Sequence, residues 1–159
     1  MTKEDAKNKG AEKGSSRSGY IAIVGRPNVG KSTLLNQLLG EKVAIVTPKP
    51  QTTRNRITGI RTSPQSQIVF IDTPGIHPAH SLMNRRMVEV ALQTLHEVDG
   101  VLWLLDSRER IGPEEERIAA NLGRLKTPSL ILLNKIDLAA KGKLLPLMQR
   151  CSELLSTKE

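Results

Sequence analysis

The sequence predicts an α/β domain in which a mostly parallel sheet carries helices on both faces. Apolar runs that suit buried strands alternate along the chain with longer segments that have helical spacing. Polar motifs that begin at Gly25, Asp72 and Asn134 directly follow three of the apolar runs. Because ligands of open α/β sheets bind at the carboxyl ends of the strands, these motifs are expected to meet at one edge. The 159 residues suffice for one domain with a hydrophobic core.

The domain is expected to begin with a strand, a loop and a helix. Residues 20–24 are a short apolar run, which predicts a buried strand, and the paired leucines of residues 33–39 predict a helix. Gly40 is a suitable end for that helix. Residues 56–62 and 67–71 then predict two strands, which a Ser-Pro-Gln-Ser turn joins.

Helices and strands alternate in the second half of the chain. Apolar side chains at helical spacing predict a helix over residues 82–98, and residues 100–105 predict a buried strand. Residues 112–116 open a further helix, because proline suits its first position and acids suit its first turn. Residues 128–133 predict the next strand, and residues 144–155 predict a last helix.

A phosphate-binding loop follows the first strand. Residues 25–32 match the pattern G-x-x-x-x-G-K-S, so the domain is predicted to be a P-loop NTPase. Glycines let successive backbone N–H groups face one anion, and the helix that follows adds partial positive charge. Lys31 is expected to reach the terminal phosphates, and Ser32 to bind Mg²⁺. The predicted phosphate-binding residues of this loop are Gly25, Arg26, Pro27, Asn28, Val29, Gly30, Lys31 and Ser32.

A second phosphate motif begins at Asp72, which comes directly after a strand and starts a D-x-x-G pattern. Its carboxylate can hold Mg²⁺ through water, and the N–H of Gly75 can meet the terminal phosphate. Alone, this tetrapeptide is a common turn, but its place after a phosphate loop favours a nucleotide site. Thr73, Pro74 and Ile76 complete the predicted phosphate-binding segment.

A base-reading motif of four residues, Asn134, Lys135, Ile136 and Asp137, follows the last predicted strand. The Asp137 carboxylate can accept hydrogen bonds from both the ring N–H and the exocyclic amine of guanine. Lys135 can lie along the base plane, and Asn134 can tie the motif to the phosphate loop. The two kinds of motif together predict that the chain binds GTP and GDP.

Composition sets few limits on function. Residues 1–18 are polar and predict a disordered tail, so that residues 19–159 form the domain. Cys151 is the only cysteine, which excludes an internal disulfide and fits the reducing cytoplasm. The net charge of +8 could attract RNA, but most of the basic residues between 41 and 61 suit a solvated surface.

The residues alone leave three other classes of protein open. The chain could be a nucleotide-binding module without catalysis, and its charge would also suit a simple RNA-binding protein. An ATPase is disfavoured by Asp137, because adenine lacks the paired donors that this carboxylate needs.

Four segments together resemble the Era family of bacterial GTPases. They are GRPNVGKSTLLN at 25–36, VTPKPQTTRNRITGI at 46–60, DTPGIHPAHSLMN at 72–84 and NKID at 134–137. The resemblance implies a Ras-like domain that hydrolyses GTP with Mg²⁺. It implies that Thr53, rather than Thr52, is the threonine that senses the magnesium ion. The metal ligands would then be Ser32, Thr53 and Asp72, and the catalytic residues would be Lys31, Thr53 and Gly75.

The family resemblance also implies a cellular role. Such a protein is expected to be a molecular switch in the assembly of the small ribosomal subunit and in 16S rRNA processing. It would bind the rRNA of that subunit through a KH domain that follows the GTPase domain. A cytoplasmic location with peripheral association with the inner membrane is expected.

The sequence departs from the family pattern in two places. After Leu155 the family continues with a strand, a second guanine-side loop, a closing helix and the KH domain, so the GTPase domain is expected to be incomplete. Ile76 stands where Ras-like proteins carry a water-orienting glutamine, so slow hydrolysis is expected. Asn28 resembles the asparagine with which relatives hold K⁺, although an asparagine that braces the turn would look the same.

Overall fold

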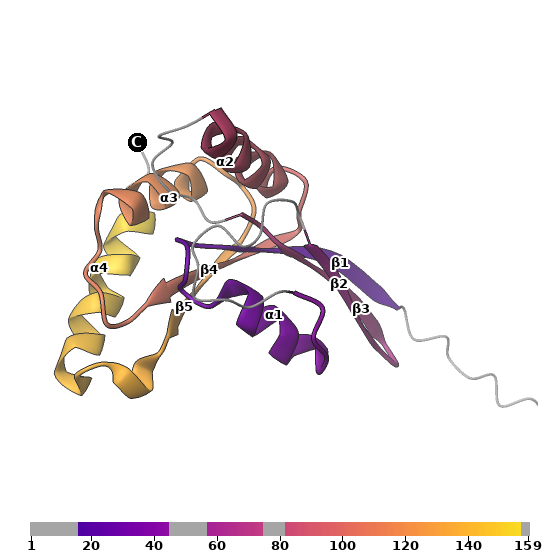
Figure 1. Cartoon of the computed structure of the whole chain (residues 1–159), viewed down its shortest axis with the longest axis horizontal. Helices are drawn as coiled ribbons and strands as arrows, with labels where there is room; N and C mark the ends of the chain where they lie inside the picture. The colour runs from indigo at the N-terminus through magenta and orange to yellow at the C-terminus, as the bar shows by residue number, and fades with distance from the viewer. Residues whose placement is uncertain (1–15, 45–56, 75–81, 157–159) are drawn as a thin grey trace, which may run out of the picture.

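The computed structural model describes residues 16–44, 57–74 and 82–156. In these segments a five-stranded sheet has the strand order β2-β3-β1-β4-β5 (Figure 1). The strands are β1 (Arg17–Val24), β2 (Ile57–Ser63), β3 (Ser66–Asp72), β4 (Gly100–Asp106) and β5 (Ser129–Asn134). The helices are α1 (Lys31–Leu39), α2 (Leu82–Leu95), α3 (Pro113–Gly123) and α4 (Leu144–Ser156), with short 3-10 turns η1 (Ile136–Leu138) and η2 (Lys141–Lys143). The predicted α/β fold is therefore confirmed.

The direction of the strands brings the polar motifs to one edge of the sheet. β1 is parallel to β3 on one side and to β4 on the other, and β5 is parallel to β4. β2 runs antiparallel to β3, as expected for a hairpin. Because four strands run in one direction, the segments that follow β1, β3 and β5 leave the sheet at the same edge.

Helices cover both faces of the sheet, and each face has its own core. α1 lies on one face, whereas α2 and α3 lie on the other, with α4 beside α3 (Figure 1). The alternation of side chains along β1 feeds both cores, since Ala22 and Val24 point to one face and Ile23 to the other. The core under α1 is built around Ile23, Leu35, Ala44 and Phe70.

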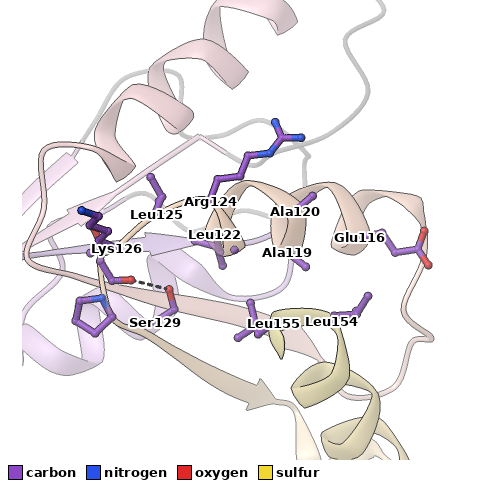
Figure 2. A pocket seen from close by; sticks show the side chains of 13 residues that line it. Glu116, Ala119, Ala120, Leu122, Arg124, Leu125, Lys126, Ser129, Leu154 and Leu155 are labelled. Atoms are coloured by element: carbon purple, nitrogen blue, oxygen red, sulfur yellow. Dashed lines mark hydrogen bonds between the residues drawn. The ribbon is translucent and has the colours of Figure 1, made fainter. Parts of the chain in front are cut away.

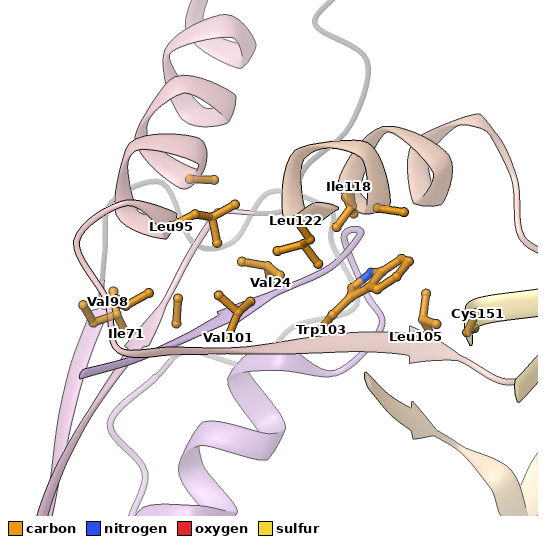
Figure 3. Close-up of a cluster of buried hydrophobic side chains, with 13 residues drawn as sticks. Val24, Ile71, Leu95, Val98, Val101, Trp103, Leu105, Ile118, Leu122 and Cys151 are labelled. Carbon is orange, nitrogen blue, oxygen red and sulfur yellow. The ribbon is translucent and has the colours of Figure 1, made fainter. Parts of the chain in front are cut away.

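The larger core lies between the sheet and α2, α3 and α4. Trp103, the only tryptophan of the chain, is fully buried there on β4. Its ring lies under α3, close to Ile118 and Leu122, and Cys151 of α4 closes the far end of the cluster (Figure 3). The tryptophan therefore reports on how α3 packs against the sheet.

Two boundaries differ from the sequence prediction, and two short turns were not predicted. β1 begins at Arg17, where the backbone N–H bonds to the Gln65 carbonyl at 3.1 Å, so residues 17 and 18 of the predicted tail belong to the sheet. Residues 1–15 lie outside the described segments. α2 ends at Leu95 rather than residue 98, because His96 and Glu97 close a tight turn with 3.1 Å hydrogen bonds to carbonyls three residues earlier. The turns η1 and η2 carry no periodic pattern that could have predicted them.

The side of the sheet that carries β5 contains two hollows. A groove of about 680 Å³ runs between β5 and α4 and is lined mainly by apolar side chains such as Leu130, Ile131 and Met148. A pocket of about 1010 Å³ lies between α3, the start of β5 and the end of α4 (Figure 2). None of the helices in the described segments is long and apolar enough to cross a bilayer.

Candidate nucleotide-binding site

The loop between β1 and α1 has the backbone that its glycines predict. Gly25 has a φ of 149°, and a Cβ there would lie 2.4 Å from the Leu104 carbonyl oxygen. Gly30 has a φ of 107°, and its Cβ would lie 2.4 Å from Nδ2 of Asn134. Asn28 also has a positive φ, of 63°. The loop therefore folds tightly against the sheet and delivers the chain to the first turn of α1, where unpaired N–H groups favour an anion.

Lys31 lies folded over this loop. Its Nζ donates to the carbonyl oxygens of Gly25 at 3.0 Å and Arg26 at 2.8 Å, and the residue is buried. Burial lowers the pKa of Lys31 to about 8, although the negative charge of Asp72 acts in the opposite direction. Within the described segments, this buried ammonium faces two carbonyl oxygens and the carboxylate of Asp72, so a bound phosphate would add a favourable interaction.

Ser32 and Asp72 bring together oxygen ligands that suit a magnesium ion. The Ser32 hydroxyl donates to Oδ2 of Asp72 at 2.6 Å, and Asp72 is fully buried at the end of β3. A hydroxyl and a carboxylate beside a phosphate loop fit the small, oxygen-preferring Mg²⁺ ion. Thr73 holds this segment to the sheet, because its hydroxyl donates to the Ile23 carbonyl at 2.8 Å.

Part of the predicted phosphate site lies outside the described segments. This applies to Thr53, Gly75 and Ile76, so their roles stay predictions. Pro74 is described and is buried beside Thr73. The structure therefore places the phosphate loop and the start of the D-T-P-G segment.

The side chain of Arg26, a residue of the phosphate loop, points toward acidic residues near the start of α3. Arg26 forms ion pairs with Glu109 and Glu115, and its Nε lies 3.8 Å from Glu114. These carboxylates lie at or just before the first turn of α3, so any contact from Arg26 to phosphate would come from its backbone. Pro27 is half-buried.

The guanine motif is tied to the phosphate loop by a side chain. Nδ2 of Asn134 donates to the Val29 carbonyl at 2.7 Å, although the two residues are 105 positions apart. Ile136 and Asp137 are exposed on η1 at the rim of the site. The motif thus presents the predicted guanine-binding carboxylate beside the predicted phosphate cradle.

Lys135 makes a second tie between the two segments. Its Nζ donates to the Asn28 carbonyl at 2.7 Å and to Oδ2 of Asp106 at 2.7 Å. Asp106 also pairs with Arg108, whose Nη2 lies 2.7 Å from Oδ2. The hydrogen bonds from Arg108, followed by that from Lys135, hold the pKa of Asp106 well below its usual range, against the effect of burial.

Sequence reasoning missed the contribution of the end of β4. Neither Asp106 nor Ser107 belongs to a motif of the sequence. In the structure, Asp106 pairs in register with Asn134, and the Ser107 hydroxyl donates to the Asn134 carbonyl at 2.6 Å. The one signal in the sequence was the position of Asp106, which directly follows an apolar predicted strand as Asp72 and Asn134 do.

Taken together, the fold and the site define a P-loop protein with a guanine-reading motif, which is the GTPase class. The family model described as 50S ribosome-binding GTPase matches residues 20–135. This chain belongs to that family.

The predicted resemblance to Era is confirmed by individual relatives. GTPase Era of Geobacter metallireducens is 55% identical over 129 residues, which cover 81% of this chain and 43% of that protein. GTPase Era of Syntrophus aciditrophicus is 51% identical over 143 residues, which cover 90% of this chain and 47% of the relative. The chain therefore spans about half the length of the curated relatives that it matches.

Solved structures show the same similarity. Era in complex with MgGDPNP and nucleotides 1506–1542 of 16S ribosomal RNA has a TM-score of 0.80 at 43% identity, over 87% of this chain and 47% of that chain. A variant of Aquifex aeolicus Era bound to GDP·AlF4⁻ has a TM-score of 0.78 at 43% identity, over 86% of this chain and 47% of that chain.

Proposed function

We propose that this chain binds GTP together with Mg²⁺ and hydrolyses it to GDP and phosphate. The observation that carries the proposal is the joining of three motifs at one sheet edge. Asn134 bonds to the Val29 carbonyl of the phosphate loop at 2.7 Å, and Ser32 bonds to Asp72 at 2.6 Å. A base reader, a phosphate cradle and a pair of magnesium ligands thereby face the same space.

The described residues contribute to hydrolysis mainly through charge. The Lys31 ammonium and the backbone N–H groups at the start of α1 would stabilise negative charge that develops on the transferred phosphate. Mg²⁺ held by Ser32 and Asp72 would neutralise phosphate charge. Because Ile76 cannot orient a water molecule through a hydrogen bond, the intrinsic rate is expected to be slow.

Asn28 is the residue through which a monovalent ion would assist. It is exposed on the phosphate loop, and a K⁺ ion on its side-chain oxygen would place positive charge beside the transferred phosphate. Potassium should then accelerate hydrolysis more than sodium. Asn28→Ala should erase the difference, and so should Asn28→Gly, which tolerates the φ of 63°. Equal rates in both salts would show that Asn28 only braces the turn.

The switch function and its cellular setting extend the proposal. A relative has been solved with a GTP analogue and with 16S rRNA, which supports a role for this chain in small-subunit assembly and rRNA processing. The chain spans about half the length of these relatives, so the role of the whole protein enters only as part of this proposal. Cytoplasmic location and peripheral binding to the inner membrane belong to the same proposal.

Nucleotide selectivity gives the direct test of GTP binding. Fluorescently labelled GTP, GDP and ATP are titrated against the purified chain in Mg²⁺ buffer. Asp137→Asn should lower the affinity for GTP by at least about tenfold and raise the affinity for xanthosine triphosphate, whose ring presents the exchanged donor and acceptor. Equal affinity of the unmodified chain for ATP and GTP would contradict the proposal.

Catalysis needs a separate measurement, because a nucleotide-binding module without activity would pass the titration. Phosphate release is followed in a single turnover with the chain in excess over GTP. Release that depends on Mg²⁺ and disappears in Lys31→Ala supports an enzyme. Tight GTP binding without release would favour the non-catalytic module.

A further inference from the structure

Asp106 is a buried carboxylate that the proposed reaction does not use. Its side chain is 3% exposed at the end of β4. Oδ1 accepts hydrogen bonds from the backbone N–H and Nε of Arg108 at 3.1 and 2.9 Å. Oδ2 accepts from Nη2 of Arg108 and from Nζ of Lys135, both at 2.7 Å. Four donors therefore fix the orientation of this carboxylate.

The contact to Lys135 is the one that reaches the nucleotide site. Among the described residues, the ammonium of Lys135 has two acceptors, which are Oδ2 of Asp106 and the Asn28 carbonyl, both at 2.7 Å. A lysine side chain is flexible, and a single acceptor would leave its stem free to turn. With one acceptor on each side, the stem is held between β4 and the phosphate loop, which is where the proposed function requires it in order to lie along a guanine base.

Ser107, the residue after Asp106, binds the backbone of the guanine motif. Ser107 donates to the Asn134 carbonyl through its hydroxyl at 2.6 Å and through its backbone N–H at 3.0 Å. This contact follows from the parallel register, which sets Asp106 opposite Asn134. Asp106, the last residue of β4, and Ser107, which follows it, thus bind two consecutive residues of the guanine motif.

We propose that Asp106 is a positioning residue for guanine binding, which acts by holding the Lys135 ammonium against the phosphate loop. The inference rests on the proposed function and assigns this site a residue in addition to its base-reading motif. Arg108 supports Asp106 from the solvent side with a 44% exposed side chain. The competing explanation is that Asp106 only neutralises two nearby cations and thereby stabilises the fold.

A double-mutant cycle separates these explanations. The dissociation constant for labelled GDP is measured for the full chain, Asp106→Asn, Lys135→Met and the double variant. Asp106→Asn and Lys135→Met should each weaken GDP binding by about tenfold. The double variant should bind GDP as weakly as Lys135→Met alone. Effects that multiply in the double variant would overturn the proposal, because Asp106 would then act independently of Lys135.

Asp99→Asn is the matched control. Asp99 also flanks β4 and also accepts a backbone hydrogen bond, from Tyr20 at 2.7 Å, but it lies at the opposite end of the strand. Its substitution should leave GDP affinity unchanged. If the unmodified chain shows no preference for GDP over ADP, the proposed function fails and the inference fails with it. If that preference is present and Asp106→Asn retains full GDP affinity, only the inference fails.

A milder variant covers the case in which Asp106→Asn does not fold. Arg108→Gln removes the guanidinium that orients Asp106 but leaves the carboxylate and Lys135 in place. It should weaken GDP binding about twofold to threefold, and this loss should vanish in the Lys135→Met background. A loss that persists in that background would overturn the proposal. Circular-dichroism melting of each variant without nucleotide identifies those that fold.

Discussion

The phosphate half and the guanine half of the site are held in place by different forces. The phosphate half follows β1 and β3 in the middle of the sheet, and its polar side chains Lys31, Asp72 and Thr73 are buried. The guanine half follows β5, which has only β4 beside it in the described sheet, and none of the four residues of its motif is buried. Burial therefore fixes the phosphate half, whereas a few side-chain hydrogen bonds fix the guanine half.

This difference implies that the two halves respond differently to added structure. The groove between β5 and α4 is lined mainly by apolar side chains, and β5 is an edge strand of the described sheet, with no strand paired on its outer side. A further strand beside β5 would support the guanine motif directly. It would affect the phosphate loop only indirectly, through the contacts that the guanine motif makes with that loop. Adding the continuation found in longer relatives is therefore expected to raise GTP affinity and thermal stability together.

The largest effect is expected in the phosphate half from Lys31→Ala. Loss of a buried, charged donor to the phosphates should lower GTP affinity about 100-fold or more. The melting temperature without nucleotide should stay the same or rise, because the removed ammonium is desolvated in the fold. Titration of labelled GTP and a thermal melt measure the two quantities. Lys126→Ala, at an exposed position of the opposite sheet edge, should change neither quantity. A Lys31→Ala variant whose melting temperature falls sharply while its GTP affinity stays normal would refute the assignment.

The pH dependence of stability sharpens the description of the phosphate half. The pKa of Lys31 is lowered from 10.5 to about 8, so the unfolded chain binds the proton more tightly than the fold does. The resulting loss of stability is fully present below pH 8 and is relieved as the pH rises from 8 to 10.5. Between pH 7 and 10, the free energy of unfolding should gain about 2 kcal/mol from this residue. The free energy of unfolding is measured by urea denaturation at each pH for the unmodified chain and for Lys31→Ala, and the predicted gain is the difference between the two pH dependences. Identical pH dependences would contradict the prediction.

A smaller effect is expected in the guanine half from Asn134→Ala. The variant removes the 2.7 Å hydrogen bond to the Val29 carbonyl. It should lower GDP affinity about fivefold to tenfold and destabilise the chain by about 1 kcal/mol. Asn121→Ala is the control, because Asn121 makes the same kind of hydrogen bond, to Arg117 at 2.7 Å, within α3. If Asn134→Ala disrupted binding as strongly as Lys31→Ala, the guanine half would not be the more loosely coupled part.

The placement of the phosphate half could be predicted from sequence because its geometry is local. Gly25 and Gly30 set the loop, and the helix that begins at Lys31 follows directly. Asp72 could be placed because it ends an apolar run. Ser32 and Asp72 then meet through the parallel pairing of β1 with β3, which agrees with the predicted, mostly parallel sheet.

The support of the guanine half could not be predicted in the same way. The contacts of Asp106 and Ser107 depend on the register between β4 and β5, and a shift of one residue would turn both side chains away. The ion pairs of Arg26 likewise depend on where α3 begins relative to the loop. No residue pattern within one segment carries that information, so these contacts were visible only in the folded chain.

The close approach of Gly30 to Asn134 means that substitutions in the phosphate half also affect the guanine half. A single methyl group at position 30 would lie 2.4 Å from Nδ2 of Asn134, so it would displace the Asn134 side chain even when no nucleotide is bound. During evolution, a substitution of Gly30 that changed the affinity for phosphate would therefore also reduce the selectivity for guanine. Second-site changes that rescue such a variant would have to make room around Asn134 and also relieve the strained loop backbone, since Gly30 has a φ of 107°.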